Sequence, residues 1–395
     1  MRVVIVNKKK FDRAPDRIWC LKIIQHLRAL GHDVRLLTAA HSERHDFGLG
    51  DAIRYLPTSQ SAVLHTITFC LALYPTLAFQ IICWQPDVVL LDVYSFWAAI
   101  PWDWMARAGL TSTRFVLDFR AMPSPRPGQP LLNLLERWLF AVAAWYGKRV
   151  LNGITVLTPQ MRDYLEKLPG PRPSRLAIWS SGVEPADFDP QTVTPAPRPP
   201  MLKGAFVALY HGAFGFNRGL IEAVEAMHLL REACPTVRLW LVGDGPAYAA
   251  VQERIAALRL EERVLLQPAL PYELIPPCVK LCDVGLLAYP NAEFWHTSNP
   301  LKLLEYMAMG KPVILRDIEA FRAAIADSGC GLFLHDNAPA TVARALAGAY
   351  QRRHELPALG AGGRARVLAQ YTWAAQARTL AAFFTAVARP EMESA

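Results

Sequence analysis

Two series of alternating apolar runs and amphipathic stretches, separated by a proline-dense segment, constrain this chain more than any other feature. The short runs are rich in β-branched residues, and the longer stretches have the periodicity of helices. Such alternation is typical of parallel sheets, because a parallel strand needs a crossover connection, usually a helix, to reach the next strand. The sequence therefore predicts an α/β protein with two Rossmann-like domains, each built on a doubly wound parallel sheet.

The positions of the expected elements follow from these runs. In the first series a helix at 16–30 stops at Gly31, and strands are expected at 2–7, 32–38, 87–91, 114–118 and 153–157. In the second series strands are expected at 205–211, 237–242, 263–267, 283–288 and 312–315. Its helices are expected to start near Arg218, Pro246, Pro300 and Ile318, followed by helices at 339–353 and 373–387.

Prolines mark the boundary between the two domains. The run Pro195-Ala-Pro-Arg-Pro-Pro200 excludes both a helix and a central strand. We assign residues 1–190 to the N-terminal domain, 191–204 to a linker, 205–371 to the C-terminal domain and 372–395 to a closing helix that crosses back. Open parallel sheets bind ligands beyond the carboxyl ends of their strands, so we expect the site in a cleft that the two domains face.

Composition and charge narrow the class of protein. With 52% hydrophobic and 19% charged residues, the chain is globular rather than disordered. The net charge of +8 is concentrated in residues 1–200, which suits an anionic surface or a phosphate-bearing partner, or only a solvated basic face. The cysteines are scattered without metal-binding spacing, so we expect reduced thiols in a cytoplasmic protein with no metal and no cofactor. We expect no nucleic-acid partner, because no binding module is recognised.

One stretch is compatible with three interpretations. Residues 61–84 carry no Asp, Glu, Lys or Arg and are long enough to span a bilayer. Pro75, His65 and Gln80 count against a span, which would also cut the first sheet in two. A helix that dips into a membrane surface also fits the composition, and so does a buried or groove-lining helix. Peripheral contact with the anionic inner face of a membrane is therefore left open.

The segment from residue 297 onward carries the clearest binding chemistry. Thr297, Ser298 and Asn299 are good N-cap types, and Pro300 suits a first helical turn. The free N–H groups of that turn, in which Leu301 lies, favour an anion such as a diphosphate.

Two charged residues follow on the same helix. Lys302 adds a positive charge to the first turn, and Glu305 is placed to accept hydrogen bonds from a ribose diol. Alternatively, Lys302 is a solvated surface charge and Glu305 pairs with it.

The run P-L-K-L-L-E-Y-M-A-M-G-K-P-V, residues 300–313, resembles the donor-site signature of the GT-B fold glycosyltransferases called family 4. In that family two glutamates separated by seven residues flank the nucleotide-sugar, and Glu305 matches the second, which binds the donor ribose. Thr297 stands where the first would be, and Asn299-Pro300 replaces the usual Phe-Gly. The resemblance implies a retaining enzyme with no required metal, with the nucleotide end intact and the sugar end altered.

A second stretch, Tyr210-His-Gly-Ala-Phe-Gly-Phe-Asn-Arg-Gly-Leu220, resembles the family's glycine turn and the basic-Gly pair whose cation neutralises the donor diphosphate. Gly212 falls on the turn and Arg218 on the basic position. Ala213 stands where the family often has a second Arg, and Lys302 is our candidate for compensation. The resemblance is good over residues 150–388 and loose over 1–150.

The N-terminal domain is expected to bind the acceptor. Asp16 and Arg17 open its first helix, and Arg120 follows another strand together with Asp118. These residues are candidates for acceptor or phosphate binding, although Asp16 is equally typical of a helix start.

Together these residues predict a glycosyltransferase that moves a sugar from a nucleotide-sugar to a glycan or lipid-linked acceptor and releases a nucleoside diphosphate. No catalytic residue is assigned. One alternative function of the same fold is a nucleotide-sugar epimerase, for which we find no suitable carboxylate and histidine set. A second is a protein that binds a nucleotide without turnover, a function that Thr297 and Ala213 keep open.

Overall fold

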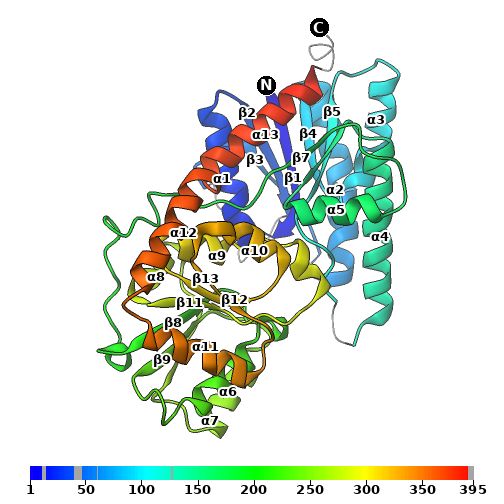
Figure 1. The fold of residues 1–395 in the computed structure, drawn as a ribbon. Helices are drawn as coiled ribbons and strands as arrows, with labels where there is room; N and C mark the ends of the chain where they lie inside the picture. Colours follow the sequence, from blue (N-terminus) through cyan, green and yellow to red (C-terminus); the bar gives the residue numbers. More distant parts are fainter. Residues whose placement is uncertain (11–14, 40–46, 60, 126–127, 390–395) are drawn as a thin grey trace. The chain divides into compact units, whose positions relative to one another are not determined.

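The computed structural model describes residues 1–395 apart from 11–14, 40–46, 60, 126–127 and 390–395. The chain divides into two compact units, Met1–Ser180 with Trp373–Ala395, and Ser181–Thr372 (Figure 1). The first division falls at Ser180 rather than at the expected 190. The reason is that Val183 and Phe188 are fully buried in the core of the second unit.

The described part of the first unit is built on a parallel sheet with the strand order β3-β2-β1-β4-β5-β6-β7. Its strands are β1 (Arg2–Lys10), β2 (Asp33–Ala39), β3 (Ile53–Leu56), β4 (Val88–Asp92), β5 (Arg114–Phe119), β6 (Gly153–Val156) and β7 (Leu176–Ile178). Its helices are α1 (Pro15–Ala29), α2 (Ala62–Phe79), α3 (Ile100–Arg107), α4 (Pro130–Arg149), α5 (Pro159–Lys167) and α13 (Trp373–Ala388), with short helical segments η1 (Gly50–Ala52), η2 (Gln80–Trp84) and η3 (Phe96–Ala99).

Where a helix connects one strand to the next, the direction of that connection along the sheet decides which face the helix covers. The connection from β1 to β2 runs one way along the sheet, and the later connections from β3 to β7 run the other way. Because parallel crossovers are right-handed, the two directions place helices on opposite faces. Helix α13 packs against α1 on one face, while α2, α3 and α4 cover the other (Figure 1).

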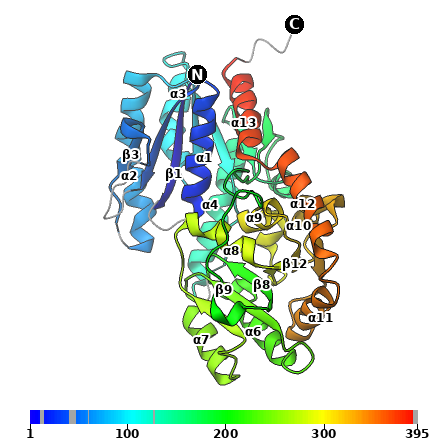
Figure 2. The same cartoon turned by 90° about the vertical axis from the view of Figure 1, so that its left-hand side faces the viewer.

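The second unit contains a parallel sheet with the order β10-β9-β8-β11-β12-β13 (Figure 2). Its strands are β8 (Phe206–His211), β9 (Val237–Val242), β10 (Val264–Gln267), β11 (Val284–Leu287), β12 (Val313–Arg316) and β13 (Gly331–Leu334). Its helices are α6 (Leu220–Leu229), α7 (Tyr248–Ala257), α8 (Ile275–Leu281), α9 (Leu301–Ala308), α10 (Glu319–Ile325), α11 (Pro339–Gln351) and α12 (Leu356–Gln370), with short helical segments η4 (Pro200–Leu202), η5 (Phe216–Arg218), η6 (Tyr272–Leu274), η7 (Glu293–Thr297) and η8 (Ala326–Ser328).

In this second sheet β8 and β11 lie side by side, and the strand order grows outward from them in both directions. Every residue of β8 and β11 is buried, as expected for central parallel strands that helices cover on both faces. The loops after β8 and β11 therefore leave the carboxyl edge toward opposite faces and open a crevice between them. Open parallel sheets in general bind their ligands at such a point.

The α/β fold with two parallel sheets confirms the prediction from the sequence, but three strands were missed. These strands are β3, β7 and β13, and each forms one edge of its sheet. These three strands have only three or four residues each, most of them partly buried, so they are too short for their periodicity to distinguish a strand from a loop.

A close approach of two helices in the second unit gives a stability prediction. A Cβ atom on Gly360 in α12 would overlap the carbonyl oxygen of Gly310, just after α9. We expect Gly360→Ala to destabilise the protein by about 1–3 kcal/mol, the usual cost of overpacking. Gly348→Ala in α11 is the matched control, because nothing lies within 4 Å of its added Cβ, and it should stabilise by about 0.5–1 kcal/mol. Thermal unfolding of both variants tests the difference, and equal midpoints would contradict the close helix contact.

Candidate functional site

Two loops meet at the switch point of the second sheet. One follows β8 and contains Gly212 and Gly219, and the other follows β11, beginning at Ala288. Gly219 has φ +68°, and a Cβ atom there would overlap the carbonyl oxygen of Ala288. The backbones of the two loops are thus in direct contact, and only glycine fits at this position. This contact fixes the position of the loop after β8 relative to the loop after β11.

Arg218 precedes this glycine, and its guanidinium group lies on aromatic rings. Its Cζ atom is 4.3 Å from the ring centre of Trp295 and 5.3 Å from that of Tyr289. The two rings are stacked with centres 4.3 Å apart. Nε and Nη1 of Arg218 are buried and hydrogen-bond to no described residue. A planar guanidinium fork held in place with free donors is suited to bind the oxygens of a phosphate group.

Lys302 lies close to Gly212 and to a third aromatic ring. Its Nζ atom is 4.0 Å from the ring centre of Tyr210, and a Cβ atom on Gly212 would lie 2.9 Å from Nζ. The pKa of Lys302 is held well below its usual value, mainly by burial and then by the positive charge of Arg218. Two cations close enough for Arg218 to lower the pKa of Lys302 favour an anionic ligand between them. The sequence left a solvated Lys302 open, and the enclosed ammonium group argues against it.

Glu305 is buried on the same helix, α9, and is held by residues from other elements. Its Oε1 atom accepts a 2.8 Å hydrogen bond from the Tyr272 hydroxyl, and Nε2 of His211 lies 3.4 Å from Oε2. Burial raises the pKa of Glu305 to about 7, against the opposing effects of the Tyr272 hydrogen bond and Lys302. Burial, together with Lys302, holds the pKa of His211 well below its usual value, so the imidazole is neutral.

The start of α9 differs from the expectation. The N-cap position is Pro300 itself, and it makes no side-chain cap hydrogen bond. The hydroxyl groups of Thr297 and Ser298 turn back to the carbonyl oxygen of Phe294, at 3.4 Å and 2.7 Å, because these residues end the short helical segment η7. The predicted capping role of these two hydroxyl groups was therefore wrong.

Asn299 takes part in fixing this loop through its backbone. Its carbonyl oxygen accepts a 3.0 Å hydrogen bond from the Ser181 hydroxyl, and the side chain is buried. Leu301 and Lys302 then form the first turn of α9, whose N–H groups have no partner within a helix. The helix start thus still directs backbone donors and a positive dipole end outward from the turn.

In the first unit a cavity of about 90 Å³ lies at the carboxyl ends of β1, β4 and β5. Arg120 lines this cavity, with its Cζ atom 3.9 Å from the ring centre of Trp179 and 4.7 Å from that of Trp19. Asp118 also lines the cavity, and it accepts hydrogen bonds from the Thr155 hydroxyl at 2.7 Å and the Trp179 indole at 3.1 Å. The structure therefore places both Asp118 and Arg120 in the wall of the cavity.

Of the other two acceptor candidates, the structure describes the side chain of Arg17 alone. Arg17 is not among the residues that line this cavity, and its Cζ atom lies 5.3 Å from the ring centre of Phe47. The side chain of Asp16 lies outside the described residues. Lys8, which the sequence did not single out, lines the cavity with Nζ 3.6 Å from the ring centre of Tyr94.

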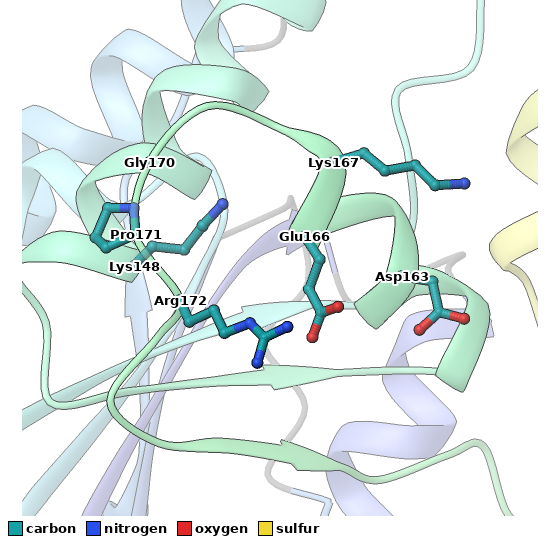
Figure 3. A pocket seen from close by; sticks show the side chains of 7 residues that line it. All are labelled: Lys148, Asp163, Glu166, Lys167, Gly170, Pro171 and Arg172. Carbon is teal, nitrogen blue, oxygen red and sulfur yellow. The ribbon is translucent and has the colours of Figure 1, made fainter.

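A second hollow, of about 470 Å³, lies at the opposite edge of the first sheet, beside the last turns of α4 and α5 (Figure 3). Lys148 in its wall donates hydrogen bonds to the carbonyl oxygens of Leu165 and Leu168, at 3.1 Å and 2.8 Å. Glu166 and Arg172 carry opposite charges in the same wall, and Lys167 extends away from it (Figure 3). Because the ammonium group of Lys148 is already satisfied by these two carbonyl oxygens, we assign no site to this hollow.

Sequence reasoning missed the aromatic residues that position the charges. Tyr272 holds Glu305, Trp295 and Tyr289 support Arg218, and Tyr210 lies beneath Lys302. Trp295 lies in the same loop as the predicted residues, so an arginine-stacking role was accessible from the sequence. Tyr272 follows a different strand, β10, and its contact depends on the folded sheet.

Comparison with known proteins identifies the family. The model for "Glycosyltransferase Family 4" matches residues 18–187, and the model for "Glycosyl transferases group 1" matches residues 205–352. The two matches fall on the two units and together cover most of the chain. The chain belongs to the family 4 type of glycosyltransferases with the GT-B fold.

Among curated proteins, the chain is 26% identical over 207 residues to alpha-D-kanosaminyltransferase of Streptomyces kanamyceticus. The alignment covers 51% of this chain and 52% of that protein, so the chain spans about half the length of this relative. Among solved structures, sucrose-phosphate synthase from Thermosynechococcus elongatus has a TM-score of 0.75 at 16% identity, with 98% of each chain covered. The Anabaena protein HepE in complex with UDP-glucose has a TM-score of 0.72 at 13% identity, covering 98% of this chain and all of that one. These two structural similarities show the fold of the chain and nothing beyond it.

The raised pKa of Glu305 gives a prediction for stability against pH. The folded protein binds this proton more tightly than the unfolded chain, so the contribution of Glu305 is full below its ordinary pKa of 4.5 and is lost as pH rises through about 7. Glu305→Gln retains an acceptor for Tyr272 and has no charge to bury. Between about pH 5 and pH 8 the free energy of unfolding of the wild type should fall by on the order of 3 kcal/mol relative to that of this variant.

Thermal unfolding across this pH range measures the effect. Glu293→Gln, an exposed carboxylate in the same loop region, is the matched control and should follow the wild type. If the unfolding midpoints of the wild type and Glu305→Gln differ by the same amount at every pH, Glu305 does not titrate as its burial implies.

Proposed function

We propose that this protein transfers a sugar from a nucleotide-sugar to an acceptor and releases a nucleoside diphosphate. The observation that carries the proposal is Arg218, whose buried Nε and Nη1 atoms hydrogen-bond to no described residue while Trp295 holds the group in place. A cation oriented in this way without a protein partner is suited to a fixed anion of the ligand. Membership of the family 4 type supports the same reaction class.

We assign the diphosphate of the donor to Arg218, Lys302 and the first turn of α9. Arg218 supplies a planar fork, Lys302 a point charge and the helix start a set of N–H donors. The absence of a second arginine at Ala213 is compensated by Lys302, whose Nζ approaches Gly212 in the same turn. The complex of HepE with UDP-glucose, a protein of the same fold, supports a nucleotide-sugar as the ligand.

Glu305 is the residue we assign to the ribose of the donor. Its Oε1 atom accepts from Tyr272, which leaves further lone pairs on the carboxylate for the two hydroxyl groups of a ribose. At the sugar end, Thr297 provides a hydroxyl group where the family resemblance implies a carboxylate. We therefore propose that this enzyme holds the sugar by hydrogen bonds rather than by a charge at this position.

The proposed reaction breaks the bond between the anomeric carbon and the diphosphate oxygen and forms a bond from that carbon to an acceptor oxygen. The nucleoside diphosphate leaves with the electron pair of the broken bond, and its phosphate oxygen takes up the proton that the acceptor hydroxyl loses. Arg218, Lys302 and the helix start stabilise the negative charge that develops on it. From the family resemblance we propose retention of configuration at the anomeric carbon.

We assign the acceptor to the mouth of the cavity of the first unit, which at about 90 Å³ has room for one group of the acceptor and not for a whole glycan. Lys8 and Arg120 bring positive charge to its wall, Asp92 and Asp118 bring carboxylates, and Trp19 and Tyr94 bring aromatic surface. Aromatic faces suit sugar rings, and charged side chains of both signs suit their hydroxyl groups, so a glycan or a lipid-linked glycan is the acceptor we propose. We also propose a cytoplasmic location, which the free cysteine thiols support.

Calorimetry with UDP, GDP and ADP tests the donor site. We expect one of these nucleotides to bind the wild type and Arg218→Ala to weaken that binding roughly 10- to 100-fold, the effect of losing a charge-assisted hydrogen bond to phosphate. Arg352→Ala, an exposed arginine of the same unit, is the matched control and should bind as the wild type does. Equal affinity in all three proteins would remove Arg218 from the site.

Turnover is tested by incubating the protein with a panel of nucleotide-sugars and measuring release of the nucleoside diphosphate. Slow hydrolysis of one donor is expected in the wild type and its loss in Glu305→Ala and Arg218→Ala, because both variants disturb the same bound nucleotide. The anomer formed first, read by NMR, tests retention. Nucleotide binding with no release from any donor would favour a binding protein without turnover.

A further inference from the structure

Helix α2 and its continuation η2 are apolar on both faces. On the inner face Phe69, Leu73 and Leu77 are fully buried. On the outer face large apolar side chains recur at helical spacing and are 43–65% exposed: Leu64, Ile67, Leu71, Tyr74 and Ile82. A surface helix of a globular protein ordinarily presents polar and charged residues outward. The outer face of α2 is therefore that of a helix with a further apolar partner.

Residues Leu64–Trp84 have a mean hydropathy of 1.7 and, by length and composition alone, form a helix long and apolar enough to cross a membrane. The strands on either side of it, β3 and β4, belong to the same sheet, and the buried half of α2 packs onto the unit. A crossing would expose that buried half and separate the two strands. The fold therefore leaves only the outer half of the helix for contact with another apolar phase.

The neighbouring elements extend this surface. The Tyr74 ring of α2 lies 6.1 Å from that of Trp102 in α3, and Phe96 of η3 lies 5.7 Å from Tyr146 in α4, so these elements are adjacent. They carry further exposed apolar side chains, 38–82% exposed: Trp97, Trp104, Leu131, Leu134, Leu135, Trp138 and Trp145. We call these residues, together with the outer residues of α2, the apolar face. Single exposed apolar residues are ordinary, but a surface shared by adjacent helices marks an interaction site.

The charges around the apolar face are mostly basic. Arg107 and Arg149 are exposed at the ends of α3 and α4, and the Cζ atom of Arg54 lies 5.7 Å from the ring centre of Phe79. The acid of α3, Asp103, is buried and accepts a 2.9 Å hydrogen bond from Arg107. A basic border attracts anionic headgroups and repels a second copy of the same border.

We propose that the apolar face rests on the surface of a lipid bilayer that contains anionic lipids. The side chains of α2 and α4 enter the boundary between headgroups and acyl chains, and the arginines bind headgroup phosphates. Tryptophan side chains, with an apolar ring and a polar N–H, are suited to this boundary, and Trp104 and Trp138 are 67% and 59% exposed. The protein thus lies on the membrane and does not span it.

Flotation of the full chain with vesicles tests this proposal. We use phosphatidylcholine vesicles with and without about 30% phosphatidylglycerol and compare the wild type with the double variant Leu71→Glu, Trp138→Glu. Leu71 and Trp138 are both exposed, so the fold tolerates a glutamate at either position. The wild type should float with the anionic vesicles, and the variant should partition at least roughly tenfold less, because two charges would have to enter the apolar boundary.

The control is the double variant Leu229→Glu, Leu368→Glu, which changes exposed leucines of the second unit and should float as the wild type does. Nucleotide binding should be equal in all three proteins, which shows that each is folded. A wild type that does not float, or equal flotation of both double variants, overturns the proposal. A dimer in vesicle-free sedimentation that Leu71→Glu, Trp138→Glu abolishes would also overturn it, in favour of a second copy.

Discussion

The candidate site depends on charged groups that the fold buries at the carboxyl end of β8. These groups form no direct ion pair with one another that would neutralise them. Arg218 has buried donors with no described partner, Lys302 is enclosed beside it, and Glu305 is held as an acceptor by Tyr272. Burying such groups costs free energy unless they are satisfied. The surrounding core holds this unfavourable arrangement in place, and we propose that the cations are satisfied when an anion binds.

The rest of the second unit can be understood as support for these groups. Gly219 allows the loops after β8 and β11 to touch, and Gly212 leaves the space that the Lys302 ammonium group occupies. The stacked rings of Trp295 and Tyr289 then hold the guanidinium group without donating to or accepting from it. An aromatic support fixes the direction of the guanidinium group while leaving its Nε and Nη1 donors without a described partner, which a carboxylate partner would not do. The ligand preference that we propose therefore follows from what the arginine packs against.

Local signals in the sequence indicated candidate residues and central strands, but contacts between distant segments could not be predicted. Arg218, Lys302 and Glu305 became candidates because glycine turns, a helix start and spacing are local signals, and the central strands were found because they are mostly apolar. The edge strands β3, β7 and β13 and the Tyr272 contact depend on which strands become neighbours. The capping prediction for Thr297 and Ser298 failed because η7 ends there and takes both hydroxyl groups. The uncharged stretch at 61–84 was visible, but only the structure shows which half of it is exposed.

Our central proposal is that Arg218 and Lys302 receive the diphosphate of a nucleotide donor. A crystal structure of the protein with the nucleoside diphosphate that binds it best measures this directly. We expect phosphate oxygens within hydrogen-bond distance of Nε or Nη1 of Arg218 and of Nζ of Lys302, with the ribose hydroxyl groups on Glu305. A nucleotide bound elsewhere, or Arg218 paired with a protein carboxylate while the nucleotide is present, would contradict it.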